Sequence, residues 1–342
     1  MARAKIADVA RQAGLSVSTV NRVLNEPAKV REETIKAVLQ AAETIGFYGL
    51  GTIRSQINAR RPKYRFGFLL LQPTRTYYKM LGAAIGSIAA NFADSEIEPV
   101  IIFAEDLSPQ HVAAQLLELG RTCQAIAVVA AVHPLVLQAV DTLQAEGVPV
   151  FGLISQLSAT GNANYVGLDN WKVGRTAAWA IANICKQPGK VGIFVGNHRF
   201  RCQEMNETGF RSYFREFASE FTLLEPLSTF ETSAVAEELT EKLLAEHPDL
   251  SGLFVAGGGI SGVITGLRNC GKAGQVVTVG HQLMDNTRFG LLDGTLSMII
   301  NSPTETFVLE TVSAMIRACQ AGADQGRQTI VIPFEICTRE NI

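Results

Sequence analysis

A short stretch near the N-terminus carries side chains that suit contact with a nucleic acid. Arg22 can donate two hydrogen bonds to the major-groove edge of guanine, and Val17 and Ser18 can contact other base edges. Hydrogen bonds to phosphate oxygens position a protein on a duplex without specifying sequence. The side chains suited to that role are Thr19, Asn21 and Asn25. The stretch therefore predicts one surface that contacts both the phosphate backbone and the base edges of a nucleic acid.

Helical spacing around this stretch would hold those side chains on one face. Apolar residues at i, i+3, i+4 and i+7 predict a helix over 6–13, which Gly14 ends. Ser16 can cap a second helix that starts at Val17 and stops before Pro27. A third apolar pattern predicts a helix over 32–45. Two helices joined by a short turn with a glycine, followed by a third, are typical of a helix-turn-helix domain.

Charge divides the chain in the same place. Residues 1–65 hold 12 Lys or Arg and 5 Asp or Glu, a net charge of +7, whereas the remaining residues carry −9 and the whole chain −2. A basic N-terminal segment on an acidic body predicts a polyanion as the partner of the first segment only. A solvated basic tail is the simpler alternative, but the patterned apolar residues argue against it.

The stretch "KIADVARQAGLSVSTVNRVLN", followed by "KVREETIKAVLQAAETIGF", resembles the lactose-repressor (LacI) family of bacterial transcription regulators. The resemblance implies that Val17, Ser18 and Arg22 read bases. Asn21 stands where serine is usual, and its side chain retains the phosphate role. The family has a hinge helix whose leucine enters the minor groove. Here Arg54 matches, Gln56 replaces the leucine, and Ile57 is the expected apolar wedge.

From residue 66 the sequence alternates short apolar runs with helical stretches. Runs such as 66–72, 125–131 and 190–196 predict strands buried on both faces, as in parallel sheets covered by helices. There are too many for one sheet, so we expect two doubly wound α/β subdomains. The fold class predicted is thus a small all-α helix-turn-helix domain with an α/β body of two parallel-sheet subdomains.

Ligands of such sheets bind beyond the C-terminal ends of the strands. The residues after each strand are rich in hydrogen-bonding groups, which suits a sugar or polyol. Taken singly, each is more often an ordinary loop residue. The candidate effector-binding residues are Tyr77, Tyr78, Ser155, Asp169, His198, Arg199, Arg201, Asn206, His281 and Gln282.

The body also resembles a periplasmic-binding-protein sensor, through "GLDNWKVGRTAAWAI", "NETGFRSYFRE" and "VTVGHQL". By this likeness Asp169 matches an effector-binding aspartate. The implied domains are 1–48 for DNA binding, 49–65 for the hinge, and 66–342 for effector binding and dimerisation. One lobe is expected at about 66–162 and 291–322, the other at about 163–290 and 323–342.

Two departures from the family pattern bear on the ligand. Asn206 stands where many members place a sugar-binding arginine, and His281 and Gln282 replace the usual Phe-Asp pair. Arg199 or Arg201 could supply the missing guanidinium. With His198 beside them, they also permit an acidic or phosphorylated sugar as the alternative to a neutral one.

Several classes of protein are disfavoured. The six cysteines are widely spread without a Cys-x-x-Cys pair, so we expect reduced thiols and no metal site. The run Gly257–Gly259 lacks the spacing of a nucleotide-binding loop, and we expect it to line the pocket without any cofactor. The sequence has no Gly-x-Ser-x-Gly motif and no general acid that can be paired with a general base, so nothing in it indicates an enzyme. No apolar run approaches a membrane span, and the N-terminus has no signal-peptide core, so we expect a cytoplasmic protein.

The sequence therefore predicts a DNA-binding transcription regulator, expected to be a repressor, controlled by a small polar effector such as a sugar, polyol or sugar derivative. Its partners would be a pseudo-palindromic operator, the effector and a second copy in a homodimer. Two other classes share the body: a sugar-binding solute receptor and a sugar-acting enzyme. The receptor has no use for a helix-turn-helix, and the enzyme would need an acid and a base.

Overall fold

The computed structural model describes residues 4–26, 29–49, 51, 61–157, 163–322 and 326–342. The chain divides into two units, one of Met1–Tyr64 with Phe92–Ile97 and one of Arg65–Asn91 with Glu98–Ile342. Each unit has its own core. The predicted hinge residues Arg54, Gln56 and Ile57 lie outside the described residues.

Three helices form the N-terminal part of the first unit: α1 (Ile6–Ala13), α2 (Val17–Asn25) and α3 (Glu32–Thr44). Gly14 takes a φ of 66°, which ends α1 in the left-handed conformation that glycine adopts at little cost. Ser16 caps α2, its hydroxyl accepting a hydrogen bond from the amide of Thr19 at 3.1 Å. Apolar side chains from all three helices, including Val9, Val20 and Val38, form one buried cluster. The predicted helix-turn-helix is confirmed.

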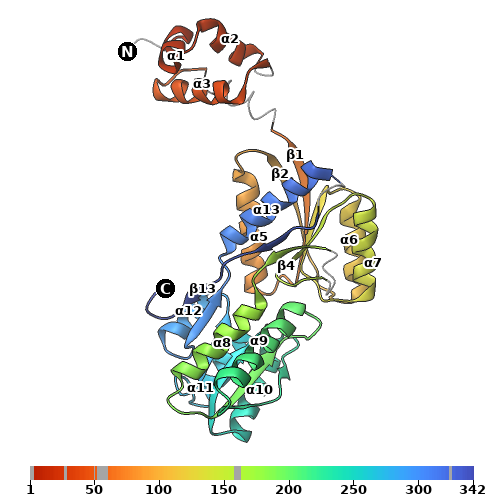
Figure 1. Cartoon of the computed structure of the whole chain (residues 1–342), viewed down its shortest axis with the longest axis vertical. Coiled ribbons are helices and arrows are strands. Elements are labelled where there is room, and N and C mark those ends of the chain that lie inside the picture. Colours follow the sequence, from red (N-terminus) through yellow and green to blue (C-terminus); the bar gives the residue numbers. More distant parts are fainter. Residues whose placement is uncertain (1–3, 27–28, 50, 52–60, 158–162, 323–325) are drawn as a thin grey trace. The chain divides into compact units, whose positions relative to one another are not determined.

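The first lobe of the body is built on a six-stranded sheet in the order β12-β5-β4-β3-β1-β2. Its strands are β1 (Lys63–Leu70), β2 (Glu96–Phe103), β3 (Ala125–Val128), β4 (Val150–Leu153), β5 (Asn164–Gly167) and β12 (Thr329–Val331). Pairing is parallel from β1 through β3, β4 and β5 to β12. Helices α5 (Thr76–Asn91) and α13 (Thr304–Ala321) pack together on one face, and α6 (Pro109–Gly120) and α7 (Pro134–Ala145) on the other (Figure 1).

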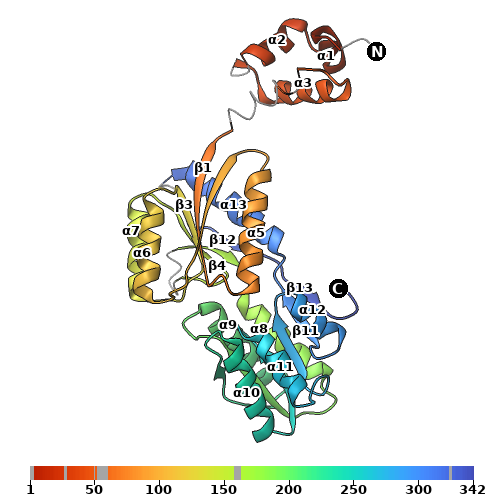
Figure 2. The same cartoon turned by 180° about the vertical axis from the view of Figure 1, so that it is seen from behind.

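The second lobe is built on a seven-stranded sheet in the order β13-β11-β10-β9-β6-β7, and β8 also pairs with β6. Its strands are β6 (Lys190–Val195), β7 (Thr222–Leu223), β8 (Leu227–Ser228), β9 (Leu250–Val255), β10 (Val277–His281), β11 (Met298–Asn301) and the antiparallel β13 (Glu335–Cys337). Its helices are α8 (Asn170–Ile184), α9 (Arg201–Phe217), α10 (Ser233–Glu246), α11 (Ile260–Asn269) and α12 (Asp285–Leu292) (Figure 2). Two parallel-sheet subdomains confirm the predicted fold class.

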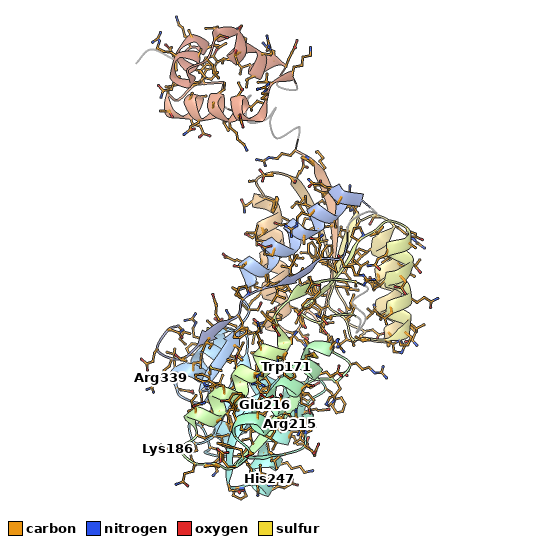
Figure 3. The ribbon with its side chains drawn as sticks, viewed as in Figure 1. Trp171, Lys186, Arg215, Glu216, His247 and Arg339 are labelled. Carbon is orange, nitrogen blue, oxygen red and sulfur yellow. The ribbon has the colours of Figure 1, made fainter. Side chains whose placement is uncertain are left out.

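Helices α8 and α9 pack closely because each presents a glycine to the other. A Cβ on Gly174 of α8 would lie 1.9 Å from the carbonyl oxygen of Asn206, and one on Gly209 would lie 2.3 Å from that of Trp171. Trp171 and Glu216, which lie on these two helices, are labelled in Figure 3. This contact fixes the register in which Asn206 faces the interior of the body.

The chain changes lobe at other points than the sequence predicted. The expectation of 163–290 and 323–342 in one lobe is wrong for β5 and β12, which pair in the first sheet. The expectation of 291–322 in the other lobe is wrong for β11, which pairs with β10 in the second sheet. These strands have three or four residues, too few for hydropathy to reveal their neighbours. In the described part of the chain, no helix is long and apolar enough to cross a membrane.

Candidate functional site

The outer face of α2 presents the side chains that the sequence singled out. Val17, at the first helical position, is 46% exposed, and Ser18, Asn21, Arg22 and Asn25 are exposed as well. Thr19 is half-buried, and its hydroxyl lies 2.8 Å from that of Ser16. Val20 and Val23 on the opposite face are buried against α1 and α3. Burial of these two valines turns the polar face outward, which is the geometry that a helix entering a DNA groove needs.

The guanidinium of Arg22 is available for an external partner. Within the described residues it takes part in no ion pair, whereas Arg11 lies 3.6 Å from Asp8 and Lys29 lies 2.9 Å from Glu26. Base contacts from a helix of this kind come chiefly from its N-terminal residues, and the exposed Val17 and Ser18 occupy its first turn. The face can therefore contact bases and phosphates at once.

A cavity of about 500 Å³ lies in the body and has walls from both lobes. The first lobe contributes residues after β1, such as Gln72 and Tyr78, and Gly167 at the end of β5. The second lobe contributes Asn206 on α9, Gly257–Gly259 after β9, and His281 at the end of β10. The size is that of a small-molecule site, and the position at strand ends is where doubly wound sheets bind ligands.

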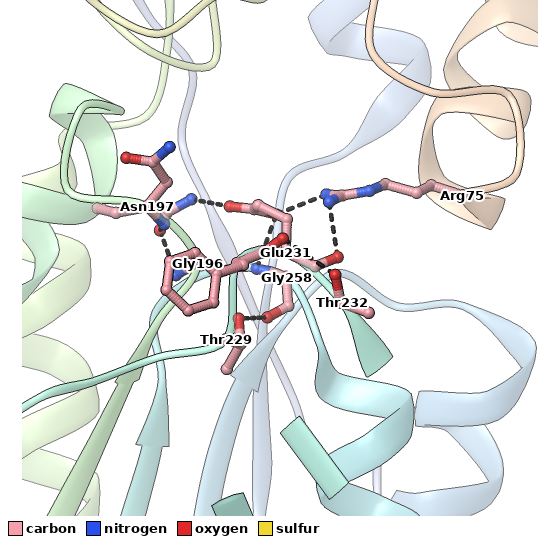
Figure 4. Close-up of polar contacts among 9 residues, drawn as sticks. Arg75, Gly196, Asn197, Thr229, Glu231, Thr232 and Gly258 are labelled. Atoms are coloured by element: carbon pink, nitrogen blue, oxygen red, sulfur yellow. Dashed lines mark hydrogen bonds and ion pairs between the residues drawn. The ribbon is translucent and has the colours of Figure 1, made fainter. Parts of the chain in front are cut away.

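An ion pair joins the two lobes in the cavity wall (Figure 4). Arg75, which precedes α5, donates from Nη1 to Oε2 of Glu231 at 2.5 Å and from Nη2 to the carbonyl oxygen of the same residue at 2.7 Å. The other carboxylate oxygen accepts a hydrogen bond from Gln203 Nε2. The amide of Gly258 also donates to Glu231 Oε2, at 3.1 Å. Both members of the pair are thus satisfied within the protein.

The loop that carries Glu231 is held in a strained conformation. Phe230 and Glu231 have φ values of 49° and 62°, in the left-handed region that non-glycine residues seldom adopt. Thr229 anchors the loop, because its amide donates to Val195 O at 2.8 Å and its hydroxyl to Gly258 O at 2.6 Å. Strain of this kind persists only where the surroundings impose it, and it concentrates at functional sites.

Three buried polar atoms in the cavity wall have no hydrogen-bond partner in the described structure: Asn206 Oδ1, His281 Nε2 and Ser302 Oγ. Leaving such groups unpaired costs free energy, so each is a candidate contact for a ligand. Burial lowers the pKa of His281 to about 4, and its imidazole is neutral at physiological pH. Burial likewise raises the pKa values of Tyr77 and Tyr78, which keep their phenolic protons.

Half of the candidate effector-binding residues lie in this wall. Those that line the cavity are Tyr77, Tyr78, Asn206, His281 and Gln282. Ser155, His198 and Arg199 do not border it, and Asp169 and Arg201 border a separate, smaller cavity of about 160 Å³.

Local contacts explain why several of these side chains lie elsewhere. Ser155 accepts a hydrogen bond from the amide of Cys202 at 3.2 Å, and Asp169 caps α8 by accepting from the amide of Lys172 at 3.1 Å. His198 lies 3.4 Å from Glu207, and Arg201 lies 3.5 Å from Glu204. The basic group that would favour an acidic sugar is therefore outside the larger cavity.

Sequence reasoning missed the Arg75–Glu231 pair. Arg75 falls within a strand-end segment, but its hydropathy and spacing do not distinguish it from its neighbours. Glu231 follows β8, a strand of two residues that leaves no apolar run to find. Among the residues that the structure describes, no group of three His, Cys, Asp or Glu side chains could hold a metal ion.

Two family descriptions match the chain. Residues 84–324 match the family described as "Periplasmic binding protein domain", which is more than half of the chain. Residues 5–49 match "Bacterial regulatory proteins, lacI family". The second match covers α1, α2 and α3, and the first covers most of the body, including the cavity wall apart from its residues at 71–78.

Curated relatives of the chain are named as repressors or transcriptional regulators. The sucrose operon repressor of Streptococcus mutans is 24% identical over 292 residues, which cover 84% of this chain and 83% of that protein. The HTH-type transcriptional regulator GalS of Salmonella typhimurium is 36% identical over 84 residues. That alignment spans 25% of this chain and only 24% of the relative.

Solved structures share the fold of the body. A periplasmic solute-binding protein of an ABC transporter from Actinobacillus succinogenes, with bound D-allose, superposes with a TM-score of 0.72 at 19% identity. The superposition covers 82% of this chain and 98% of that one. At this identity the likeness establishes the architecture of the two lobes and no more.

Proposed function

Because the chain belongs to the lacI family of bacterial regulatory proteins, with a periplasmic-binding-protein domain as its body, we propose that a sugar bound in the body controls how tightly α2 holds its operator. The observation that carries this proposal is a combination of two features. The polar face of α2 is exposed, and the cavity wall holds buried polar atoms that have no hydrogen-bond partner among the described residues. The function is that of a sequence-specific transcription regulator, and we expect repression. In this role the protein works in the cytoplasm.

The face of α2 assigns a role to each of its polar residues. Arg22 donates to guanine, and Val17 and Ser18 contact neighbouring base edges. The phosphate contacts that hold the helix in register come from Thr19, Asn21 and Asn25. A homodimer presents two such helices to successive major grooves, which requires a pseudo-palindromic operator. Light scattering of the full chain measures whether the dimer forms without DNA.

The cavity suits a polyhydroxy ligand. A sugar hydroxyl both donates and accepts hydrogen bonds, so it can satisfy Asn206 Oδ1, His281 Nε2 and Ser302 Oγ in turn. Tyr77, Tyr78 and Gln282 supply further polar groups and apolar ring surface. The names of the sucrose operon repressor and of the D-allose-bound relative support the same ligand class. A ligand that prefers one lobe arrangement shifts DNA affinity by its differential free energy of binding.

The alternatives that the sequence left open are less well supported. A solute receptor would have no use for a DNA-binding segment such as residues 5–49, which match the lacI family. A sugar-acting enzyme needs an acid and a base at the ligand, yet the carboxylate of Glu231 is engaged by Arg75, Gln203 and Gly258. Steady turnover of a sugar by the full chain would nevertheless establish the enzyme and refute this part of the proposal.

Selection on fragmented genomic DNA tests the proposal directly. The full chain is incubated with the fragments at near-physiological salt, and the bound fraction is sequenced. We expect one short pseudo-palindrome to be enriched by the native chain and lost with Arg22→Ala. Enrichment that is equal for both proteins, or absent from both with and without sugars, would refute the assigned reading face.

A further inference from the structure

The charged side chains of the cavity wall cancel each other. Of the lining residues that the structure describes, Arg75 is the one Lys or Arg and Glu231 is the one Asp or Glu. His281 is neutral, and Tyr77 and Tyr78 keep their protons. Cys202, whose pKa burial raises to about 12, is a thiol. The basic residues Arg199 and Arg201 do not line this cavity. A ligand therefore meets a wall with no net charge.

The positive charge of the Arg75 guanidinium is already balanced by the carboxylate of Glu231. Two of its nitrogens already donate to Glu231, and the side chain of Arg75 is 19% exposed and that of Glu231 is 9% exposed. A carboxylate or phosphate placed beside Arg75 would also lie beside Glu231, and like charges repel strongly where water is excluded. The pair thus presents polar atoms to a ligand without presenting a free charge.

The surrounding chain is shaped to place this carboxylate. A Cβ on Gly196 would lie 1.9 Å from Glu231 Oε1, and one on Gly258 would lie 2.2 Å from Oε2, so both close approaches require glycine. Gln203 is itself held by the amides of Gly196 and Asn197, at 2.6 and 3.0 Å from its Oε1, so that its Nε2 points at Glu231. Together with the positive φ at Glu231, these contacts define a built position.

We propose that Glu231 sets the charge of the effector: by neutralising Arg75 it reserves the cavity for uncharged sugars and excludes sugar acids and sugar phosphates. The inference rests on the proposed function only in taking the ligand to be a sugar. The polar atoms left for that ligand are Asn206 Oδ1, His281 Nε2 and Ser302 Oγ, which have no hydrogen-bond partner in the part of the chain that the structure describes.

The test replaces Glu231 by Gln, which removes the charge and keeps the size of the side chain. Binding of inorganic phosphate to the full chain is titrated calorimetrically at constant ionic strength, and D-galacturonate is compared with D-galactose. We expect E231Q to bind phosphate at least tenfold more tightly than the native chain does and to shift its preference toward the uronate. The double variant R75Q/E231Q should lose this gain.

Glu216→Gln is the matched control, because Glu216 Oε1 also pairs with an arginine, Arg175, at 3.0 Å, on the outer surface of α8 and α9. The proposal would be overturned if E216Q gained as much phosphate affinity as E231Q does. It would also be overturned if the gain persisted in R75Q/E231Q, or if the native chain bound phosphate as tightly as E231Q. If E231Q does not unfold cooperatively, the R75Q variant tests the proposal instead, because it removes the positive charge and leaves the carboxylate of Glu231 without its partner. It should favour D-galactosamine over D-galactose at least fivefold relative to the native chain, and an unchanged preference would overturn the proposal.

Phosphate binding requires neither an operator nor the natural effector. Failure of the charge assignment is therefore distinguishable from failure of the regulator function, which would appear in the DNA selection.

Discussion

If His281 contacts the effector as proposed, this single buried side chain links ligand binding to pH. Its Nε2 is buried with no hydrogen-bond partner among the described residues, and its ring centroid lies 5.6 Å from that of Phe254. Removal from water penalises the charged imidazolium, so the folded protein holds the neutral form. A neutral imidazole can either donate to or accept from a sugar hydroxyl, according to its tautomer. The same desolvation makes the stability of the body depend on pH.

The sign of that dependence follows from the two pKa values. The pKa of His281 is about 4 in the folded protein, below the ordinary 6.5, so the unfolded chain takes up the proton first as pH falls. The stability that the folded protein gains from a neutral His281 is fully present above pH 6.5 and is lost progressively as the pH falls toward 4. We expect His281 alone to lower the free energy of unfolding by up to about 3 kcal/mol over this interval. Urea denaturation at each pH measures it. His281→Asn should flatten the profile, and a profile unchanged in that variant would contradict the assignment.

Arg22 makes the corresponding prediction at the DNA. A good bidentate contact with guanine contributes about 1–3 kcal/mol of discrimination. We therefore expect Arg22→Ala to weaken binding to the selected operator by about 5- to 150-fold while leaving affinity for random DNA nearly unchanged. Fluorescence anisotropy at one fixed salt concentration measures both affinities. Equal losses on operator and random DNA would instead assign Arg22 to the phosphate backbone.

At the scale of elements, the α8–α9 contact holds much of the cavity wall in place. We expect Gly174→Ala to destabilise the body by about 1–3 kcal/mol, because the added methyl would lie 1.9 Å from the carbonyl oxygen of Asn206. Gly86→Ala on α5 is the matched control. Nothing lies within 4 Å of its Cβ position, so the change should stabilise by up to about 1 kcal/mol. Thermal unfolding of the two variants measures the contrast, and equal effects would contradict the close packing.

Helices and strands with strong patterns were predictable from the sequence. The caps at Gly14 and Ser16 located α1 and α2, and apolar runs located β1, β3 and β6. Two-residue strands such as β7 and β8 have no period to detect, and α12 has a mixed pattern and begins after Met284, a residue type that does not indicate an N-cap in a sequence. Short edge strands also hid which sheet β12 joins, and this misplaced the boundaries between lobes.

The cavity was predictable only where a residue follows a clear strand. Tyr77 and His281, which that rule selects, lie in the wall, but the rule also selects Asp169 and His198, whose local partners hold them elsewhere. It gave no reason to choose Glu231, because a contact between Arg75 and Glu231 joins residues 156 positions apart. Such pairs arise from tertiary packing, which a single sequence does not display.

At the scale of the whole molecule, the proposal joins two chemistries in one chain. In this proposal the helix-turn-helix reads DNA through a few exposed side chains, and the body binds a sugar through buried ones. Thermodynamic linkage requires that a ligand which changes operator affinity is itself bound with altered affinity by the DNA complex. Coupling free energies of this kind are typically about 1–3 kcal/mol. The coupling is therefore large enough to measure from either side.

The most direct measurement is the operator affinity of the full chain with and without a neutral sugar that calorimetry shows to bind. We predict that one such sugar changes the Kd for the selected operator by at least fivefold, in line with typical allosteric coupling. Asn206→Ala, which removes a cavity contact and leaves α2 intact, should abolish the change while preserving sugar-free affinity for the operator. The account would be contradicted if every neutral sugar that binds the body left the Kd for the operator unchanged.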